Sequence, residues 1–161
     1  MKSVHDRAMF HIVLFRPEIP QNAGNVIRLC ANTGCRLHLI RPLGFRMDQR
    51  ELRRAGLDYH EHAEVAVHDA LATVPARSDR LFAFTKHATR GHHEVAFQPD
   101  DVLLFGSETS GLPADVLETV PPERRLRIPM QPGSRSLNLA NAAAIAVYEA
   151  WRQQGFSGAA A

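Results

Sequence analysis

A proline-marked strand exit runs directly into a helix of small residues in the last third of the chain. Residues 127–142 read RIPMQPGSRSLNLANA, so Pro129 and Pro132 stiffen a loop between an extended segment and a helix. Two serines and an asparagine lead into this helix, whose first N–H groups have no partner within the helix. The layout can hold backbone groups around a ligand, and it also suits a capped strand-to-helix turn. The segment alone leaves both interpretations open.

The first predicted helix carries polar residues on one face. Asn25, Arg28 and Asn32 stand at positions i, i+3 and i+7, which share a face of a helix. Amides and a guanidinium group are costly to bury without a partner. The stripe is therefore either a solvent-facing surface or a face directed at a phosphate or ribose, which the planar fork of arginine binds well.

A second strand exit brackets an acidic residue with glycines. Residues 106–113 read GSETSGLP. Glycine lets a backbone approach a ligand closely and adopt positive φ. Glu108 in the middle of this segment either caps the helix that follows or holds the neighbouring loop and Arg28 in place.

Several other kinds of site are disfavoured by what the sequence lacks. The histidine pairs His60/His62 and His92/His93 have no further ligands at recognised metal spacing, which argues against a catalytic metal. No nucleophile-elbow pattern supports a Ser/His/Asp hydrolase. No P-loop is present, and no GxGxxG follows the first predicted strand, which argues against an ordinary dinucleotide or Rossmann methyltransferase site.

Composition places the chain among soluble globular proteins, with arginines gathered in local clusters. The 161 residues suit one domain, and 45% hydrophobic and 22% charged residues are ordinary for such a domain. The net charge is only +2, but arginines cluster at Arg46, Arg50, Arg53 and Arg54, and at Arg124, Arg125, Arg127 and Arg135. Clusters of this kind favour an RNA or phosphate partner over a membrane, although solvated helix faces are the simpler alternative.

The remaining features predict a reduced, cytoplasmic protein. Cys30 and Cys35 lack zinc spacing and are interpreted as structural thiols. The longest apolar stretch, residues 142–147, is far too short to span a bilayer. Residues 1–8 are polar, lack the core of a signal peptide, and are predicted to be a disordered extension or an upstream start.

Strand-like and helix-like segments alternate along the chain. The predicted strands are 11–15, 36–40, 80–85, 101–105 and 126–130, and the predicted helices are 23–33, 49–57, 113–119 and 137–154, with a short strand and helix within 65–74. Asn22 is expected to cap the first helix and Gly34 to end it. The alternation predicts a single α/β domain over residues 9–161, with a mostly parallel sheet flanked by helices on both faces. Ligands of such sheets bind at the carboxyl ends of the strands.

Taken together, the three segments resemble the SPOUT superfamily of S-adenosylmethionine-dependent RNA methyltransferases, and within it the ribose 2′-O-methyltransferases. The motifs are PQNAGNVIR at 20–28 with Asn32 to Gly34, FGSETSGLP at 105–113, and IPM through SRSLNL at 128–139. LRRAGLDYH at 52–60 and VYEAWRQ at 147–153 are similar to the short tRNA (cytidine/uridine) 2′-O-methyltransferases of the wobble nucleotide. The resemblance covers about residues 10–158, and Ala140 departs from it where relatives often carry serine.

The resemblance implies a deep C-terminal trefoil knot, a homodimer, and a tRNA anticodon loop as substrate. It implies S-adenosylmethionine contacts from Phe84, Gly106, Ile128, Met130, Ser136 and Leu137. It implies catalytic roles for Arg28, Asn32, Glu108 and Asn138, and RNA contacts from Arg53, Arg54, Tyr59, His60 and Arg135. Because arginine has a pKa above about 12, we expect Arg28 to orient the hydroxyl and stabilise its developing charge rather than to act as a free base. An rRNA 2′-O-methyltransferase and a non-catalytic RNA-binding dimer are the alternatives.

Overall fold

The computed structural model describes residues 8–48 and 64–160, in which the strands form one seven-stranded parallel sheet. The strand order is β3-β2-β1-β6-β4-β7-β5. The strands are β1 (His11–Phe15), β2 (Arg36–Ile40), β3 (Val65–His68), β4 (Leu81–Phe84), β5 (Arg90–Gly91), β6 (Val102–Phe105) and β7 (Arg125–Arg127). The described α-helices are α1 (Pro20–Thr33), α3 (Ala114–Glu118) and α4 (Leu139–Gln153). Short 3-10 turns lie at Leu71–Thr73, Ser78–Arg80, His92–Glu94 and Pro122–Arg124.

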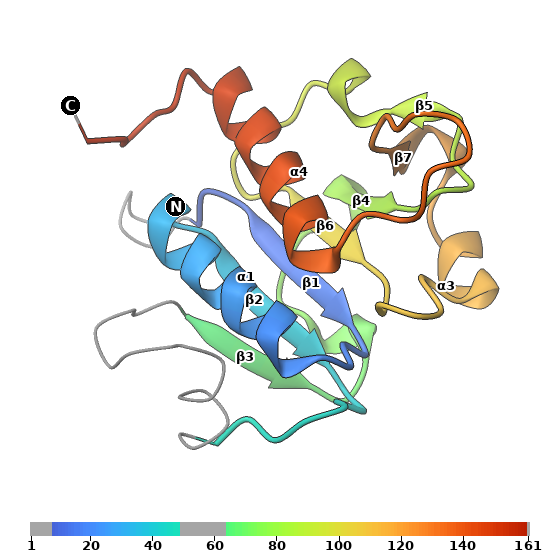
Figure 1. Ribbon diagram of the computed structural model, residues 1–161. Helices are drawn as coiled ribbons and strands as arrows, with labels where there is room; N and C mark the ends of the chain where they lie inside the picture. The colour runs from blue at the N-terminus through green and yellow to red at the C-terminus, as the bar shows by residue number, and fades with distance from the viewer. Residues whose placement is uncertain (1–7, 49–63, 161) are drawn as a thin grey trace.

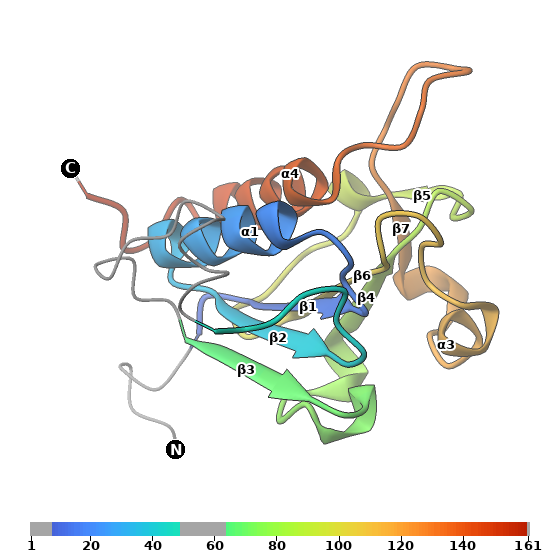
Figure 2. The same cartoon turned by 60° about the horizontal axis from the view of Figure 1, so that its bottom comes forward.

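The sheet is covered on both faces, as the alternation of elements predicts. Figure 1 shows α1 and α4 side by side, and Figure 2 shows both helices on the same side of the sheet. The opposite face is covered more thinly, by α3, the 3-10 turn at Leu71–Thr73 and residues 74–76. The α/β class with a parallel sheet is therefore confirmed.

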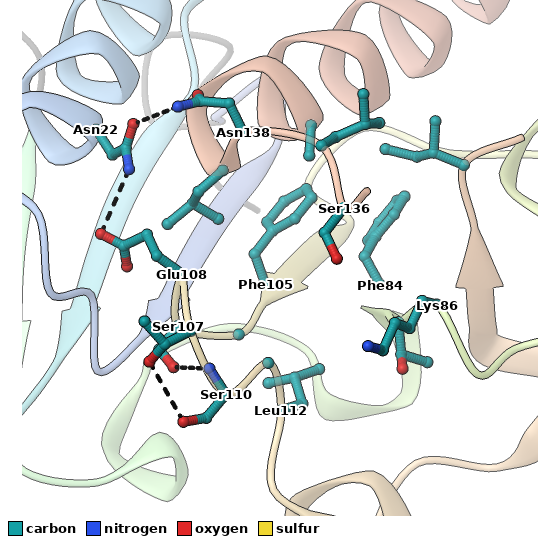
Figure 3. Close-up of a pocket in the computed structure, with 18 of the residues that line it drawn as sticks. Asn22, Phe84, Lys86, Phe105, Ser107, Glu108, Ser110, Leu112, Ser136 and Asn138 are labelled. Carbon is teal, nitrogen blue, oxygen red and sulfur yellow. Dashed lines mark hydrogen bonds between the residues drawn. The ribbon is translucent and has the colours of Figure 1, made fainter. Parts of the chain in front are cut away.

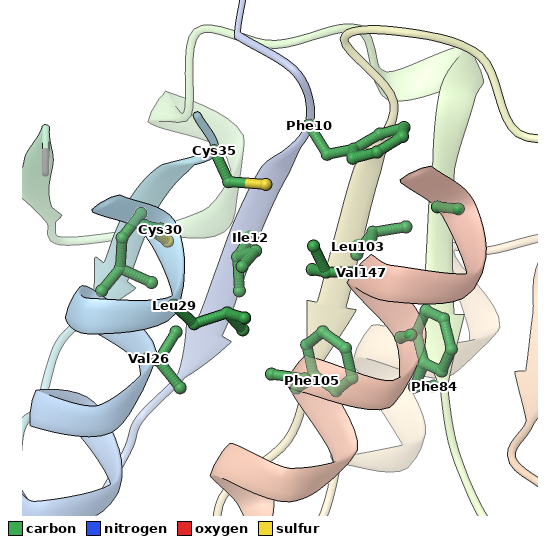
Figure 4. Close-up of a cluster of buried hydrophobic side chains, with 14 of the residues drawn as sticks. Phe10, Ile12, Val26, Leu29, Cys30, Cys35, Phe84, Leu103, Phe105 and Val147 are labelled. Atoms are coloured by element: carbon green, nitrogen blue, oxygen red, sulfur yellow. The ribbon is translucent and has the colours of Figure 1, made fainter. Parts of the chain in front are cut away.

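The position of β1 in the middle of the sheet explains its uninterrupted apolar sequence. Ile12 and Leu14 pack into the core beneath α1 and α4, whereas Val13 and Phe15 pack into the core on the opposite face. All five residues of β1 are buried, as expected for a central parallel strand. Figure 4 shows the larger core, where Leu29 of α1 and Val147 of α4 meet the strands.

Both cysteines belong to this larger core as free, buried thiols. Burial raises the pKa of Cys35 to about 11, and burial also raises the pKa of Cys30. Both thiols therefore stay protonated at neutral pH, which fits a packing role.

Neither a membrane span nor a metal cluster is found in the described residues. None of the helices there is long and apolar enough to cross a bilayer. In residues 8–48 and 64–160, no three His, Cys, Asp or Glu side chains are grouped so that they could hold a metal ion.

The first two strands lie at their predicted positions, but the prediction for the start of α1 is wrong. The helix begins at Pro20 after the cap residue Ile19, and Asn22 lies inside its first turn. Proline suits a first helical position because the N–H it lacks would have no partner there. The predicted end is confirmed, since Gly34 has φ 79° and donates its N–H to the Cys30 carbonyl.

The predicted strand 126–130 and the predicted helix 137–154 both extend beyond the elements observed, β7 and α4. The strand β7 ends at Arg127, because Pro129 cannot donate to a ladder and the chain leaves the sheet. The helix α4 starts at Leu139 because Asn138 is its cap: the Asn138 Oδ1 accepts the Asn141 N–H at 3.2 Å. The two-residue strand β5 was not predicted, since its sequence carries no periodicity.

Two predicted segments lie wholly or mostly outside the described residues. The predicted helix 49–57 lies outside them, and so does the predicted disorder of residues 1–7. Ala8, the last residue of that predicted extension, is buried.

Three histidines form a hydrogen-bonded row across neighbouring strands on the α3 side of the sheet. The His11 Nδ1 lies 3.0 Å from His38 Nε2, and the His38 Nδ1 lies 3.0 Å from His68 Nε2. Asp100 closes the row, with its Oδ1 3.2 Å from His11 Nε2. A hydrogen bond between two imidazoles needs an N–H on one ring and a lone pair on the other, so two neighbouring rings of the row cannot both be protonated while they stay hydrogen-bonded. Burial, together with positive charge on His11, His68 and Arg36, lowers the pKa of His38 to about 4.

This row predicts a loss of stability in mild acid. Unfolded histidine titrates near pH 6.5, so between about pH 6.5 and 4 the unfolded chain binds a proton at His38 that the folded chain does not. The contribution is fully present above the unfolded pKa and is lost as the pH falls through that window. We expect the melting temperature to fall over this range in the native protein and to fall less steeply in His38→Gln, which does not titrate. Thermal unfolding at a series of pH values checks this, and equal slopes in the two proteins would contradict it.

Candidate active site

A cavity of about 400 Å³ opens at the carboxyl edge of the sheet, where the strand exits predicted from sequence converge. The exits of β4 and β6, the loop after β7, and the first turns of α1 and α4 form its walls (Figure 3). This volume lies within the usual range of small-molecule sites, about 300–1,000 Å³.

Apolar side chains make up much of the wall. The Phe84 and Phe105 rings stack with centroids 4.7 Å apart and an interplanar angle of 17°. The other apolar lining residues are Ile19, Leu112, Ile128, Met130, Leu137, Leu139 and Ala142. Such a surface suits a flat, uncharged ring system.

The loop after β6 folds back on itself so tightly that one position admits only glycine. The Gly111 N–H donates to the Ser107 carbonyl at 3.0 Å, and the two residues form an isolated antiparallel bridge. A Cβ added to Gly106 would overlap the carbonyl carbon of Gly111 and the nitrogen of Leu112. Gly111 itself has φ +66°, with open space around it. The close approach at Gly106 thus fixes the shape of the cavity wall that residues 106–112 form.

Glu108 binds the N-terminal end of α1 rather than capping the helix after it. Its carboxylate accepts the Glu18 N–H at 2.9 and 3.2 Å and the Ile19 N–H at 2.5 Å. Asn22 Nδ2 is a further donor at 3.4 Å. Of the two roles predicted for Glu108, the structure supports bracing the neighbouring loop and does not support capping α3, whose cap residue is Pro113.

A return contact fixes the same junction from the other side. The Glu18 carboxylate accepts the hydroxyl of Thr109 at 2.6 Å and the Thr109 N–H at 3.3 Å. The Thr109 hydroxyl is the largest cause that lowers the pKa of Glu18. The β6 exit and the α1 entry are therefore joined in both directions.

Asn22 connects this junction to α4. It is buried, and its Oδ1 accepts Asn138 Nδ2 at 3.0 Å. Since Asn138 Oδ1 caps α4, one line of polar groups runs from Glu108 through Asn22 and Asn138 to the first turn of α4 (Figure 3). In both asparagines the amide nitrogen donates a hydrogen bond and the amide oxygen accepts one, which fixes the orientation of both side chains.

The structure brings together the predicted site residues in part. The six residues predicted to bind the cofactor, Phe84, Gly106, Ile128, Met130, Ser136 and Leu137, all line the cavity, as do Glu108 and Asn138. Arg28 and Asn32 do not line it; they are exposed on α1 together with Asn25, as their predicted common face requires. Arg135 is exposed in the loop after β7. The predicted RNA contacts Arg53, Arg54, Tyr59 and His60 lie outside the described residues.

Sequence reasoning missed Asn22 and Lys86 as site residues. Asn22 was interpreted as a cap, although its place in the PQNAGNVIR motif was a signal for a tertiary role. Lys86 follows directly after a predicted strand exit and is one of only two lysines in the chain, at 2 and 86.

The two glycines of the β6 exit loop give a matched pair of substitutions. Gly106→Ala should destabilise the protein by about 2–3 kcal/mol, because the backbone must move to admit the methyl group. Gly111→Ala should cost only about 1 kcal/mol, because open space surrounds it and only the left-handed φ is strained. Urea denaturation of both variants checks the order, and equal effects would contradict the close packing at Gly106.

Comparisons with known proteins point to one family of enzymes. The model of the SpoU rRNA Methylase family matches residues 9–148. A tRNA (cytidine(34)-2′-O)-methyltransferase of Burkholderia ambifaria is 60% identical over 156 residues, which cover 94% of this chain and 100% of the relative.

Two solved structures extend the comparison to three dimensions. One concerns the 2-OH methylation of C/U34 on tRNA; it has 48% identity and a TM-score of 0.82, and the match covers 92% of this chain and 98% of that one. The other is the SpoU methyltransferase AviRb from Streptomyces viridochromogenes in complex with AdoMet, with 25% identity and a TM-score of 0.75, and the match covers 94% of this chain and 60% of that one.

Proposed function

Because the chain belongs to the SpoU rRNA Methylase family, we propose that it methylates the ribose 2′-hydroxyl of the cytidine or uridine at position 34 of tRNA, with S-adenosylmethionine as methyl donor. The observation that carries this choice is 60% identity, over the full length of the relative, to a tRNA (cytidine(34)-2′-O)-methyltransferase. The solved structure that concerns C/U34 methylation supports the same substrate.

The cavity fits the proposed methyl donor. The stacked Phe84–Phe105 pair and its apolar neighbours suit adenine, and the backbone of Gly106, packed against Gly111 and Leu112, lines the same cavity. The AdoMet complex of AviRb is a family precedent for this cofactor. We propose that Phe84, Gly106, Ile128, Met130, Ser136 and Leu137 hold it.

The chain's own residues would then align the reacting groups. When bound, the sulfonium of S-adenosylmethionine supplies an electrophilic methyl group. Asn138 and Glu108 fix the entries of α4 and α1 beside the cavity, so the methyl donor and the hydroxyl can be held in line. Arg28 would bind the 2′-hydroxyl and stabilise its negative charge, positioned by Asn32, because its own pKa is too high for a free base.

The proposed assembly is a homodimer that acts in the cytoplasm, where tRNA is modified. Figure 1 shows α1 and α4 side by side. Ile145 and Tyr148 of α4 are 41% and 43% exposed, which supports packing against a second copy. Arg28 lies on the neighbouring exposed face of α1. The proposed dimer would bring that face toward the site of its partner.

We further propose that residues 9–161 form one domain whose C-terminal segment is knotted. Strand β7 lies between β4 and β5 in the sheet. From β7 the chain runs through residues 128–138 to α4, which packs against α1. This path supports the deep trefoil knot that the resemblance implies.

The direct test is methyl transfer to unmodified tRNA. We expect the purified protein and S-adenosylmethionine to place a 2′-O-methyl group on C34 or U34, since these are the substrates of its relatives. Mass spectrometry of nuclease digests locates the product, and a tRNA with 2′-deoxyribose at position 34 is the matched control. Methylation of rRNA fragments instead of tRNA would favour the rRNA alternative, and binding without transfer would favour a non-catalytic RNA-binding protein.

Arg28→Ala separates catalysis from cofactor binding. Arg28 does not line the cavity, so the variant should bind S-adenosylmethionine as the native protein does. Transfer to tRNA should fall by about 100-fold or more, the usual cost of removing a group that stabilises developing negative charge. Arg77→Ala, which removes an exposed arginine before β4, is the control and should keep its activity. Calorimetry and single-turnover assays check this, and loss of cofactor binding would overturn the catalytic role of Arg28.

A further inference from the structure

The cavity presents positive charge that the structure does not neutralise. The charged residues that line it are Lys86, Glu108 and Arg127. Both carboxylate oxygens of Glu108 already accept N–H groups from the α1 entry and from Asn22. Glu108 thus binds donors within the protein and, in the part of the chain that the structure describes, forms no ion pair with Lys86 or Arg127. These two cationic side chains can attract an anionic group on a ligand.

The backbone at Lys86 is held in one place by a turn. The Thr85 N–H donates to the Leu126 carbonyl at 2.9 Å, which ties the β4 exit to β7. The Thr85 carbonyl accepts the Ala88 N–H at 3.3 Å, and the Thr85 hydroxyl accepts the His87 N–H at 3.2 Å. Lys86 thus stands at the head of a fixed turn directly after the Phe84 wall.

The Lys86 side chain extends from this turn into the cavity. Figure 3 shows its amino nitrogen directed toward the space that Phe84, Ser136 and Leu112 border. Among residues 8–48 and 64–160, its ammonium group has no hydrogen bond or ion pair. The position of the side chain is therefore set by its attachment and by the wall, and its charge is available to a ligand.

We propose that Lys86 binds the carboxylate of the methionine moiety of S-adenosylmethionine. This inference rests on the proposed function, which supplies the ligand. The adenine suits the apolar wall, whereas the carboxylate needs a cation or N–H donors when it leaves water. An ammonium–carboxylate contact is a charge-assisted hydrogen bond, stronger than a neutral one.

The choice of lysine is informative in this chain. Of its 19 basic residues, 17 are arginines, and Lys86 is the single lysine in the described residues. The ammonium of lysine is a compact point charge on a flexible stem, whereas guanidinium is a wide planar fork. A compact cation can meet a small carboxylate against a closely packed wall without displacing the ring-binding side chains.

A pair of cofactors tests the contact directly. We expect the native protein to bind S-adenosylmethionine about 10-fold or more tightly than decarboxylated S-adenosylmethionine, which lacks only the carboxylate. Lys86→Met should lose about that factor for S-adenosylmethionine and bind the decarboxylated form unchanged. Lys86→Arg should recover part of the affinity. Arg127→Gln removes equal charge from the same cavity but leaves Lys86 in place, so this variant should keep the native preference for S-adenosylmethionine over the decarboxylated form.

The two lysines also allow a spectroscopic test. Reductive methylation with carbon-13 formaldehyde labels only Lys2, Lys86 and the α-amino group while keeping their charge. S-adenosylmethionine should shift the Lys86 signal and raise its titration midpoint, because a nearby carboxylate favours the charged form. The decarboxylated cofactor should not raise that midpoint, and Lys86→Met assigns the signal.

The outcomes separate this inference from the proposed function. If the native protein binds neither cofactor, the proposed function fails. If it binds both equally and Lys86→Met changes neither, the function stands and the inference is overturned. If Lys86→Met keeps cofactor affinity but raises the KM for tRNA, Lys86 contacts an RNA phosphate, and the inference is again overturned.

Discussion

The contact between the Glu108 carboxylate and the N-terminal end of α1 is the constraint on which the site depends. No acidic residue stands in the first turn of α1, and its cap residue, Ile19, makes no side-chain hydrogen bond. Glu108, from a distant part of the chain, accepts the N–H groups of Glu18 and Ile19, the two residues directly before the helix. Its negative charge also interacts favourably with the helix dipole. One side chain thus joins the exit of β6 to the start of α1.

This junction extends to a third element through amides whose orientations are determined. Asn22 donates to Glu108 and accepts from Asn138, which in turn caps α4. Reversal of either amide would place like groups together and leave a buried polar atom unsatisfied, which is costly in a low-dielectric site. The exit of β6 and the starts of α1 and α4, which border the cavity, are consequently held in one geometry. A methyl transfer needs such rigidity, because in-line displacement tolerates little error in alignment.

The limits of sequence-based prediction follow from this same network. The central strands β1 and β2 could be predicted because their apolar runs are long and bounded by turn residues. The six cofactor residues followed from the family resemblance, and the structure places all six in one cavity. The start of α1 was misplaced because Asn22 matches a local capping signal, whereas its actual partners are Glu108 and Asn138. Local patterns cannot reveal that the Asn22 amide binds side chains that lie 86 and 116 positions further along the chain.

We propose that a second copy of the chain completes the active site, because Arg28 does not line the cavity. Arg28 lies six residues after Asn22, which on a helix is about 9 Å along the axis and about 120° around it. Asn22 points into the cavity region and is buried, so Arg28 must point elsewhere, and it is exposed. No rotation of its side chain removes the 120° difference in direction. A guanidinium group that acts on a ribose must therefore meet it on the α1–α4 surface, where the proposed second copy would pack. In this proposal the helix that is fixed at one end by Glu108 has two tasks: its buried end shapes the cavity, and its exposed face would carry Arg28 to the partner's site.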